Sequence, residues 1–318
     1  MSDRPPEAVL WDCLRGALTA RAAGVAADLG VADALAEGPR PVRDVAQQVG
    51  ASPDSLHRIL RALASDGIFE EHEPGVFANT PASELLREAN GWSDFAHLFG
   101  GVFHTAARDL EAVTGEAMFP RTFGSEFWDW LRKHPDERTS FDRAMGQGKK
   151  RRLARLADLE LREGETVVDI GGGNGSFLLG LLADRPGVRG IVFDLPETNR
   201  DEDALGDRIE FAEGSFFESV PSGDFYVLGT ILHDWDDEHA DAILRTIRRC
   251  APADALLLIL DAVIAPGNEP HGAKWLDLLM LVISAGRERT EGEWRDLLGA
   301  TGFEVVSIED GLIQARCS

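Results

Sequence analysis

Positive charge is scarce in this chain of 318 residues. Only 32 Lys and Arg residues stand against 55 Asp and Glu, which gives a net charge of −23. Proteins that bind nucleic acid contact phosphates through clustered basic residues. Nucleic acid is therefore not expected as a partner.

Cysteines and long apolar runs are also scarce. The three cysteines, Cys13, Cys250 and Cys317, lack the spacing of a metal or redox motif, and we expect reduced thiols in a cytoplasmic protein. No apolar run is long enough to span a bilayer, and residues 1–6 do not resemble a signal peptide. We therefore expect no membrane association, and the length allows two domains with separate cores.

Residues 1–90 predict a helical domain with a winged helix-turn-helix. Apolar side chains recur at helical spacing over residues 8–30, helices are expected at 42–49 and from Pro53, and two short strands after Gly67 would form the wing. A winged helix suggests DNA binding, but residues 31–90 hold five basic and ten acidic residues, the wrong balance for that role. We expect this part to be a dimerisation domain, with helix 8–30 buried against a second copy.

Residues 91–155 are predicted to be helical and are rich in Phe and Trp. Most of these rings should lie in the core, and any surplus facing a cleft would make an apolar binding wall. We therefore interpret this segment as a helical linker that lines an acceptor pocket. Its basic run, Lys149-Lys-Arg-Arg152, is expected to be a solvated helix face.

Residues 156–318 alternate between strands and helices, which predicts an α/β fold with a doubly wound, mostly parallel, seven-stranded Rossmann-like sheet. Strands are expected at 166–170, 190–194, 208–212, 224–230 and 255–262, and a terminal hairpin at 303–309 and 312–317. Helices are expected near 175–184, 238–250, 273–285 and 291–301. Ligands bind beyond the carboxyl ends of such strands, where Asp169, Asp194, Ser215 and His233 lie in the sequence.

A glycine loop follows the first of these strands. Residues 167–175 read Val-Val-Asp-Ile-Gly-Gly-Gly-Asn-Gly, and Ser176 then begins a helix. A dinucleotide-binding loop would have glycine at position 176. Asp169 would repel a pyrophosphate but could hold water or the ammonium group of an amino-acid-like ligand, which favours S-adenosylmethionine (SAM) over NAD. Asp194 ends the next strand, where a carboxylate can accept hydrogen bonds from ribose hydroxyls.

His233 is the candidate base. It follows the fourth strand, and its ordinary pKa near 6.5 would leave it mostly neutral at about pH 7, able to accept a proton from a hydroxyl. A histidine that merely satisfies a loop is an equally good interpretation from the local sequence. The acids at 234 and 236–238 could suggest a metal site, but Asp236 or Asp237 capping the next helix is simpler.

Five motifs occur along the chain in this order: Asp-x-Gly-Gly-Gly-x-Gly, Phe-Asp-Leu-Pro, Gly-Ser-Phe-Phe, Leu-His-Asp-Trp and Gly-Arg-Glu-Arg-Thr. With them the whole chain, including the winged-helix part, resembles the SAM-dependent O-methyltransferases of the plant caffeate type and their actinobacterial polyketide and aromatic-acid relatives. The resemblance implies a class I SAM methyltransferase fold, a homodimer, SAM as cofactor with S-adenosylhomocysteine as product, and no metal.

The resemblance also implies roles for individual residues. His233 would be the general base, with Glu288 and Asp261 orienting it and stabilising the imidazolium. The implied cofactor-binding residues are Asp169, Gly171, Gly173, Asp194, Leu195, Gly214, Ser215 and Phe216, of which Asp194 would bind the ribose and Phe216 would stack on adenine. The implied substrate-binding residues are Met145, Phe141, Trp275, Asp277, Met280 and Asp234.

Three features depart from the family pattern. Ser215 stands where the family usually has Asp, which weakens or reroutes a contact to the adenine amine. Asp261 replaces a commoner Glu, which shortens the reach to His233. Residues 197–207 are fewer than usual between the second and third strands, and we expect a loop with only a short helix there.

The predicted function is transfer of a methyl group from SAM to a hydroxyl of a small aromatic acceptor, such as a polyketide-derived phenol or hydroxy-aromatic acid, in secondary metabolism. The oxygen would attack in line while His233 removes its proton, so that positioning and base catalysis share the work. Two alternatives are a SAM-binding relative repurposed for hydroxylation or decarboxylation, and a winged-helix regulator.

Overall fold

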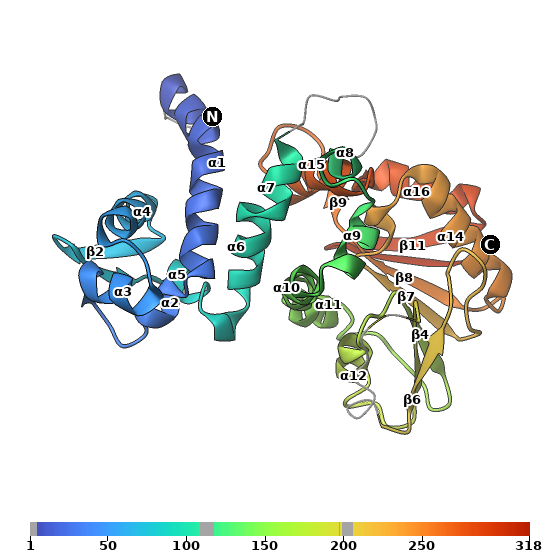
Figure 1. The fold of residues 1–318 in the computed structure, drawn as a ribbon. Coiled ribbons are helices and arrows are strands. Elements are labelled where there is room, and N and C mark those ends of the chain that lie inside the picture. The colour runs from blue at the N-terminus through green and yellow to red at the C-terminus, as the bar shows by residue number, and fades with distance from the viewer. Residues whose placement is uncertain (1–4, 109–117, 197, 199–205) are drawn as a thin grey trace. The chain divides into compact units, whose positions relative to one another are not determined.

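The computed structural model of the protein describes residues 5–108, 118–196, 198 and 206–318 (Figure 1). The described residues form two compact units, one made by those before residue 149 and the other by those from 149 onward. The three-part division predicted from the sequence, with boundaries at 90 and 155, stays a prediction. No helix in the described ranges is long and apolar enough to cross a membrane.

The first unit begins with the winged helix-turn-helix. The long helix α1 (Pro6–Asp28) is followed by α3 (Val42–Val49) and α4 (Pro53–Ser65), at the predicted positions. The wing is a small antiparallel sheet of order β1-β3-β2, formed by β1 (Arg40–Pro41), β2 (Phe69–Glu73) and β3 (Val76–Asn79). One compact core joins these elements, because Leu56, Leu60 and Leu63 of α4 pack with Phe69 and Phe77 of the wing.

The remainder of the first unit is helical, as predicted. Its further elements are α2 (Val31–Ala34), α5 (Pro81–Glu84), η1 (Glu88–Asn90), α6 (Trp92–Gly100), α7 (Val102–Ala107), α8 (Met118–Phe123), α9 (Phe127–Lys133) and α10 (Pro135–Gly146). Aromatic rings meet edge to face across α8, α9 and α10, as Phe119 does with Phe127, and Phe127 with Phe141. Phe119, Phe127 and Phe141 therefore pack against other rings of this unit.

The second unit is built on a seven-stranded sheet of order β11-β12-β8-β7-β4-β5-β6. Its strands are β4 (Thr166–Ile170), β5 (Arg189–Asp194), β6 (Ile209–Glu213), β7 (Phe225–Gly229), β8 (Leu256–Leu260), β11 (Phe303–Glu309) and β12 (Leu312–Cys317). Pairing is parallel from β8 to β6, while β12 is antiparallel to both β8 and β11. The doubly wound sheet with an antiparallel edge is thus confirmed.

Helices and short elements complete the second unit. They are α11 (Lys149–Arg155), α12 (Ser176–Leu181), η2 (Leu232–Asp234), α14 (Asp237–Cys250), β9 (Val263–Ile264), α15 (Gly272–Ile283), β10 (Arg289–Thr290) and α16 (Glu291–Ala300). A capping box begins α16: Thr290 Oγ1 accepts from the Glu293 N–H at 3.3 Å, and Glu293 Oε2 accepts from the Thr290 N–H at 2.8 Å. The loop predicted over 197–207 falls largely outside the described residues.

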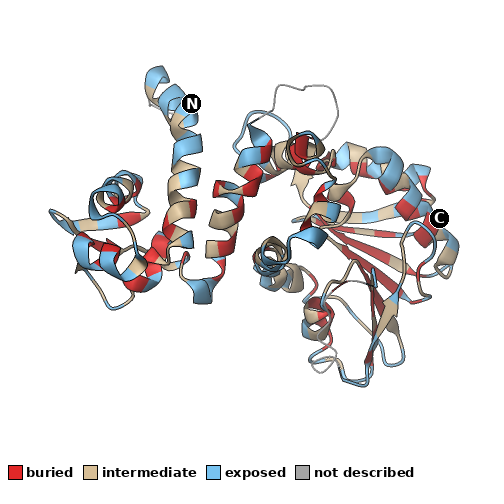
Figure 2. Cartoon of the chain, in the orientation of Figure 1, coloured by how far each residue is buried: buried red, intermediate tan, exposed pale blue. Residues whose placement is uncertain are grey.

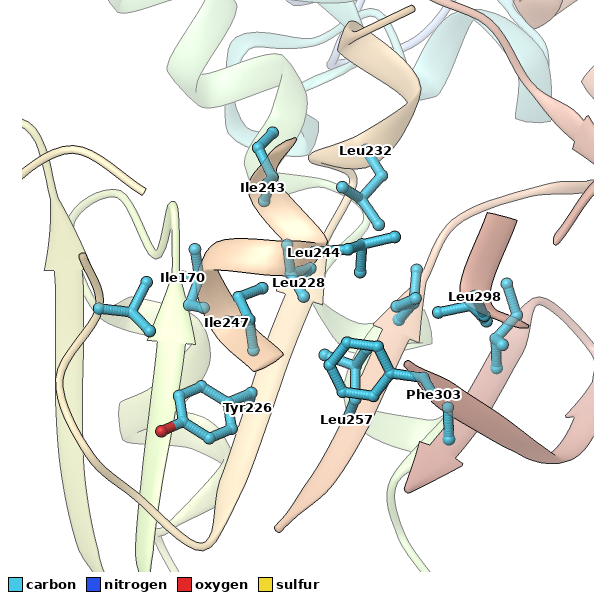
Figure 3. Close-up of a cluster of buried hydrophobic side chains, with 14 of the residues drawn as sticks. Ile170, Tyr226, Leu228, Leu232, Ile243, Leu244, Ile247, Leu257, Leu298 and Phe303 are labelled. Carbon is cyan, nitrogen blue, oxygen red and sulfur yellow. The ribbon is translucent and has the colours of Figure 1, made fainter. Parts of the chain in front are cut away.

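The core of the second unit lies on both faces of the sheet. In β8, Leu257 and Ile259 belong to one cluster of buried side chains, and Leu258 and Leu260 belong to another. Successive strand residues point to opposite faces, so a strand that is apolar throughout must be covered on both. Figure 3 shows the first cluster, and Figure 2 shows that the central strands are among the most completely buried elements. This rigid sheet carries the candidate site at its carboxyl edge.

Candidate active site

The glycine loop connects β4 to α12 and packs tightly against Asp169. A Cβ atom on Gly172 would lie 2.7 Å from Asp169 Oδ2 and 2.9 Å from a methyl carbon of Val192, so any side chain there would displace its neighbours. Gly171 and Gly173 have φ of 68° and 59°. The loop therefore brings the main chain itself up to the end of the sheet, where the Gly171 N–H donates to the Phe193 carbonyl oxygen and the Gly173 N–H to Asp194 Oδ2, both at 2.8 Å.

Asp169 is a buried acid without a complete set of partners. Its side chain is 3% exposed, and Oδ2 has no hydrogen-bond partner among the described residues. Burial raises the pKa of Asp169 to about 7. The positive charge of Arg152 opposes this shift, and the negative charge of Asp194 reinforces it. A buried carboxylate oxygen left unpaired is costly, and a donor or a cation bound beside it would remove that cost.

Asp194, at the end of β5, accepts hydrogen bonds from three separate positions around the site. Its Oδ2 accepts from the Gly173 N–H at 2.8 Å, and its Oδ1 accepts from the Leu195 N–H at 2.7 Å and from Thr198 Oγ1 at 2.8 Å. Its carbonyl oxygen accepts from the Gly214 N–H at 3.0 Å. The structure therefore brings Asp194, Gly173, Leu195 and Gly214 together, as predicted for one binding site.

Phe216 and Ser215 lie just beyond β6. Phe216 meets Phe217 at 5.0 Å and Trp235 at 6.0 Å between ring centroids, both in edge-on geometry. Ser215 Oγ accepts from the Phe217 N–H at 3.3 Å, so part of its hydrogen-bonding capacity serves its own turn. Leu195 is an exposed large apolar residue at the end of β5. These side chains supply an apolar surface at the same edge of the sheet.

His233 lies in the 3-10 turn η2 that follows β7, and it is buried. Its Nδ1 is 2.6 Å from Glu288 Oε1, while its Nε2 is 3.6 Å from Asp234 Oδ1. A carboxylate on Nδ1 fixes the ring and favours the tautomer with the proton on that nitrogen. Nε2 is then the nitrogen that could exchange a proton with a ligand.

Asp261 is close enough to His233 to act on it by charge, but it does not orient the ring through a hydrogen bond. Both of its carboxylate oxygens are buried and have no hydrogen-bond partner in the described parts of the chain. Burial raises the pKa of Asp261 to about 6 and that of Asp234 to about 7, while the charge of His233 lowers both.

The prediction that His233 is mostly neutral near pH 7 is wrong for this structure. Burial by itself would lower the pKa of His233, but the charge of Asp234, the hydrogen bond to Glu288 and the charge of Asp261 together raise it to about 10. The three acids come from separate segments of the chain and surround one imidazole. The ring is therefore protonated in the ligand-free protein at neutral pH.

The six residues predicted to bind the acceptor fall into different places. Phe141 and Met145 lie in α10 of the first unit, where Phe141 packs on Phe127 and Trp128 at 5.4 and 5.5 Å. The other four belong to the second unit, and of these Asp234 lies beside His233 as predicted.

The three candidates on α15 have different environments. Trp275 is 72% exposed, whereas Met280 is buried. Asp277 Oδ1 accepts from the Glu288 N–H at 2.9 Å. Asp277 therefore fixes the backbone of Glu288, whose carboxylate in turn contacts His233 Nδ1. This role was not predicted from the sequence.

Sequence reasoning also missed two arginines. Arg152 was expected on a solvated helix face, but its guanidinium is half-buried, lies 6.0 Å from the centre of the Phe177 ring, and lowers the pKa of Asp169 by its charge. Arg289 is completely buried beneath η2. Arg289 lies in the Gly-Arg-Glu-Arg-Thr motif, where the sequence analysis assigned a role to Glu288 but none to the arginine beside it.

One of the acids after His233 caps the next helix, and another, Asp237, pairs with Arg287 and Arg289. Asp236 caps α14 by accepting from the His239 N–H at 2.9 Å, as predicted. In the part of the chain that the structure describes, no group of three or more His, Cys, Asp or Glu side chains is arranged to hold a metal ion. Independence from metals stays a prediction.

Comparison with known proteins places this geometry in a family. Residues 103–304 match the O-methyltransferase domain, and residues 11–88 match the O-methyltransferase dimerisation domain. A phenazine O-methyltransferase, PhzM of Lysobacter antibioticus, is 38% identical over 316 residues, covering 96% of this chain and 93% of the relative. A phenazine-1-carboxylate N-methyltransferase of Pseudomonas aeruginosa is 31% identical and covers 96% of this chain and 95% of its own.

A solved structure shares the fold. NcsB1, an O-methyltransferase from neocarzinostatin biosynthesis in complex with SAM and 2-hydroxy-5-methyl naphthoic acid, is 31% identical, with a TM-score of 0.80, covering 94% of this chain and 96% of that one. The sheet and its loops thus define the class I fold of the SAM-dependent methyltransferases. The chain belongs to the O-methyltransferase family. These relatives do not favour a hydroxylase, a decarboxylase or a regulator.

Proposed function

We propose that this enzyme methylates a hydroxyl group of a small aromatic acceptor, with SAM as the donor and His233 as the group that manages the acceptor's proton. The observation that carries the proposal is the His233–Glu288 pair at 2.6 Å, which leaves Nε2 beside Asp234 at the carboxyl edge of the sheet. A base held by a second group and buried away from water is what proton removal from a hydroxyl requires.

The cofactor's proposed site is the same edge of the sheet. Asp169, whose buried Oδ2 has no hydrogen-bond partner among the residues that the structure describes, would accept from the ammonium group of SAM. Asp194 would accept from the ribose hydroxyls and Phe216 would contact the adenine, with Leu195, Gly214 and Ser215 beside them. When bound, SAM supplies a methyl carbon that its neighbouring sulfonium makes electrophilic. The protein's residues then need only to bind, orient and deprotonate.

The protonation of His233 sets how the hydroxyl is activated. For methyl transfer, His233 and the acceptor must share a single proton between Nε2 and the acceptor oxygen. Either a neutral imidazole accepts this proton from the hydroxyl, or an imidazolium donates a hydrogen bond to the acceptor anion. The neighbouring acids raise the pKa of His233 toward that of a phenol, roughly 10, which lowers the cost of passing the proton between them. The oxygen–methyl bond forms as the sulfur–methyl bond breaks, and the proton leaves later to solvent.

The acceptor's class is inferred from the relatives and from the aromatic content of the first unit. Two of the relatives are named as phenazine methyltransferases, and NcsB1 was solved with a hydroxynaphthoic acid. We propose a planar aromatic acceptor of one to three rings made in secondary metabolism, such as antibiotic biosynthesis. Phe141, Met145, Trp275 and Met280 remain candidates for contacts to its rings, and Asp234 for a contact to a polar substituent.

We also propose that the enzyme is a homodimer. Five large apolar side chains of α1 are exposed, namely Val9, Leu10, Trp11, Leu14 and Leu18. A contiguous apolar face of this kind on a soluble domain favours an interface, and the matched dimerisation domain covers this helix.

The test is a product assay by mass spectrometry. The enzyme is incubated with SAM labelled in the methyl group and with hydroxyphenazines, hydroxynaphthoates and an ortho-aminohydroxybenzoate, the last offering nitrogen and oxygen on one ring. The expected product carries the label on oxygen. Label on nitrogen alone, or an oxygenated product without label, would contradict the proposal.

A further inference from the structure

Arg289 is a buried cation next to, but outside, the set of residues assigned a role so far. Its side chain is fully buried. A buried guanidinium is costly unless its donors are met and its charge is paired. Its position therefore has to be explained by the groups around it.

The guanidinium contacts the backbone on both sides of the candidate base. Nη1 donates to the Leu232 carbonyl oxygen at 3.0 Å, and Nη2 donates to the Trp235 carbonyl oxygen at 3.1 Å. These two carbonyls bracket His233 and Asp234 in the turn η2. A planar fork with donors at fixed angles holds such a pair of acceptors at a fixed separation.

The remaining donors anchor the fork itself. Nε donates to Asp237 Oδ1 at 3.0 Å, and Nη1 donates to the Arg287 carbonyl oxygen at 3.3 Å. Nη2 also forms an ion pair with Asp237 at 2.9 Å. The charged plane lies 5.2 Å from the ring centre of the buried Trp294, a favourable arrangement. Arg289 is thus fixed by Asp237 of α14 and by Trp294 of α16.

The residues just before Arg289 serve the same turn. Gly286 lies so close that a Cβ on it would stand 2.1 Å from the His233 carbonyl oxygen, and the Arg287 N–H donates to that oxygen at 2.8 Å. Glu288 holds the imidazole itself. Four consecutive residues therefore fix the backbone and the ring of one histidine.

We propose that Arg289 is a positioning residue that fixes His233 and Asp234 in the geometry needed for methyl transfer. The inference rests on the role of His233 proposed above. Arg289 touches neither ligand, and its effect passes through the carbonyls of Leu232 and Trp235. Loosening this turn displaces Nε2, and a displacement of about 1 Å can lower a rate by roughly 100-fold.

The first variant is Arg289→Lys, which keeps the charge and removes the fork. The matched control is Arg185→Lys, because Arg185 also donates to backbone carbonyls, those of Leu181, Leu156 and Leu159, far along the chain from η2. We expect R289K to lower kcat by roughly 10- to 100-fold while the Kd for S-adenosylhomocysteine stays within about 2-fold. R185K should keep kcat even where its melting temperature falls.

A double-mutant cycle separates positioning from a general loss of stability. Once His233 is replaced by Gln, there is no base to misplace, so adding R289K should change kcat by less than about 2-fold. An equal loss from R289K with and without His233 would show a merely structural role and overturn the proposal. If H233Q keeps full turnover, the base assignment fails instead, and this result does not depend on Arg289.

A second variant covers the case in which R289K does not fold. Asp237→Asn changes a half-exposed side chain and weakens the ion pair that anchors the fork, with an expected fall in kcat of roughly 2- to 5-fold. The proton that His233 Nδ1 shares with Glu288 should give a downfield NMR resonance in the wild type that shifts or broadens in this variant. An unchanged resonance together with unchanged kcat would also overturn the proposal.

Discussion

Lowering the pH should weaken binding of S-adenosylhomocysteine, because the acid proposed to hold its ammonium group becomes neutral. Asp169 is buried, its Oδ2 has no partner among the described residues, and its pKa is raised to about 7. Below that pH the carboxyl is protonated in the empty site. The ligand's amine is mostly protonated below about pH 7.5, since α-amino groups have a pKa of roughly 7.7–8.0.

The magnitude follows from that pKa. If only the charged form of Asp169 pairs with the ammonium, affinity falls tenfold for each pH unit well below pH 7, and this dependence levels off as the pH rises above 7. Between pH 8 and pH 5 the Kd should rise roughly 100-fold, which is about 2.7 kcal/mol. Near pH 6 most molecules should release one proton on binding.

Calorimetry measures both quantities. Titrations from pH 5 to 8 give the Kd, and repeating them in buffers with different ionisation enthalpies gives the number of protons released. Asp169→Asn should bind more weakly at pH 8 and show a flat pH dependence. Because Asp234 also titrates near pH 7, Asp234→Asn is the control and should keep the slope. A flat wild-type profile, or a slope that survives in D169N, would refute the reasoning.

Four further predictions concern the reaction and the assembly. His233→Gln should lower kcat by roughly 10²–10⁴-fold with little change in SAM affinity, because the base is lost while the proposed cofactor contacts stay; steady-state kinetics would contradict this by showing near-normal turnover. Wild-type kcat should fall steadily from alkaline through neutral to acid pH, because the raised pKa of His233 leaves both the imidazole and a phenolic acceptor, with a pKa of roughly 10, protonated there; a pH–rate profile that rises toward acid would exclude this order of protonation. EDTA should leave turnover unchanged, and loss of activity restored by magnesium would reopen the acids at 234–238 as a metal site. Leu14→Glu with Leu18→Glu should give monomers by light scattering, since both side chains are 76% exposed on α1; a persistent dimer would place the interface elsewhere.

The fold could be predicted because each signal was local. The central strands are apolar runs ended by an acid or a glycine, and β4, β11 and β12 were predicted with their observed bounds. The same locality placed Asp169, Asp194 and His233 at one edge, since parallel strands share a carboxyl end. The protonation of His233 could not be predicted, because its acids stand at 234, 261 and 288 and meet only in the folded chain.

The two missed arginines have a similar cause. Arg152 belongs to a run of four basic residues, and such runs are usually solvated, so nothing in its neighbours indicated that one of them is drawn inward. Arg289 contacts carbonyl oxygens, which every residue has, so its partners leave no trace in the sequence. The pairing of Asp277 with the Glu288 N–H is hidden for the same reason.

The capping box of α16 has a consequence for how the enzyme loses activity on heating. Glu293 accepts from the Thr290 N–H and also pairs with Arg287 at 2.8 Å, so the first turn of the helix and the segment that holds His233 share one set of bonds. Segments joined in this way open together as one cooperative unit of local unfolding. Fraying of α16, remote from any ligand, would then release Glu288 from His233 at the same moment. Inactivation would follow the opening of this single unit at temperatures where the sheet is still folded, and amide exchange at Glu293 would report it.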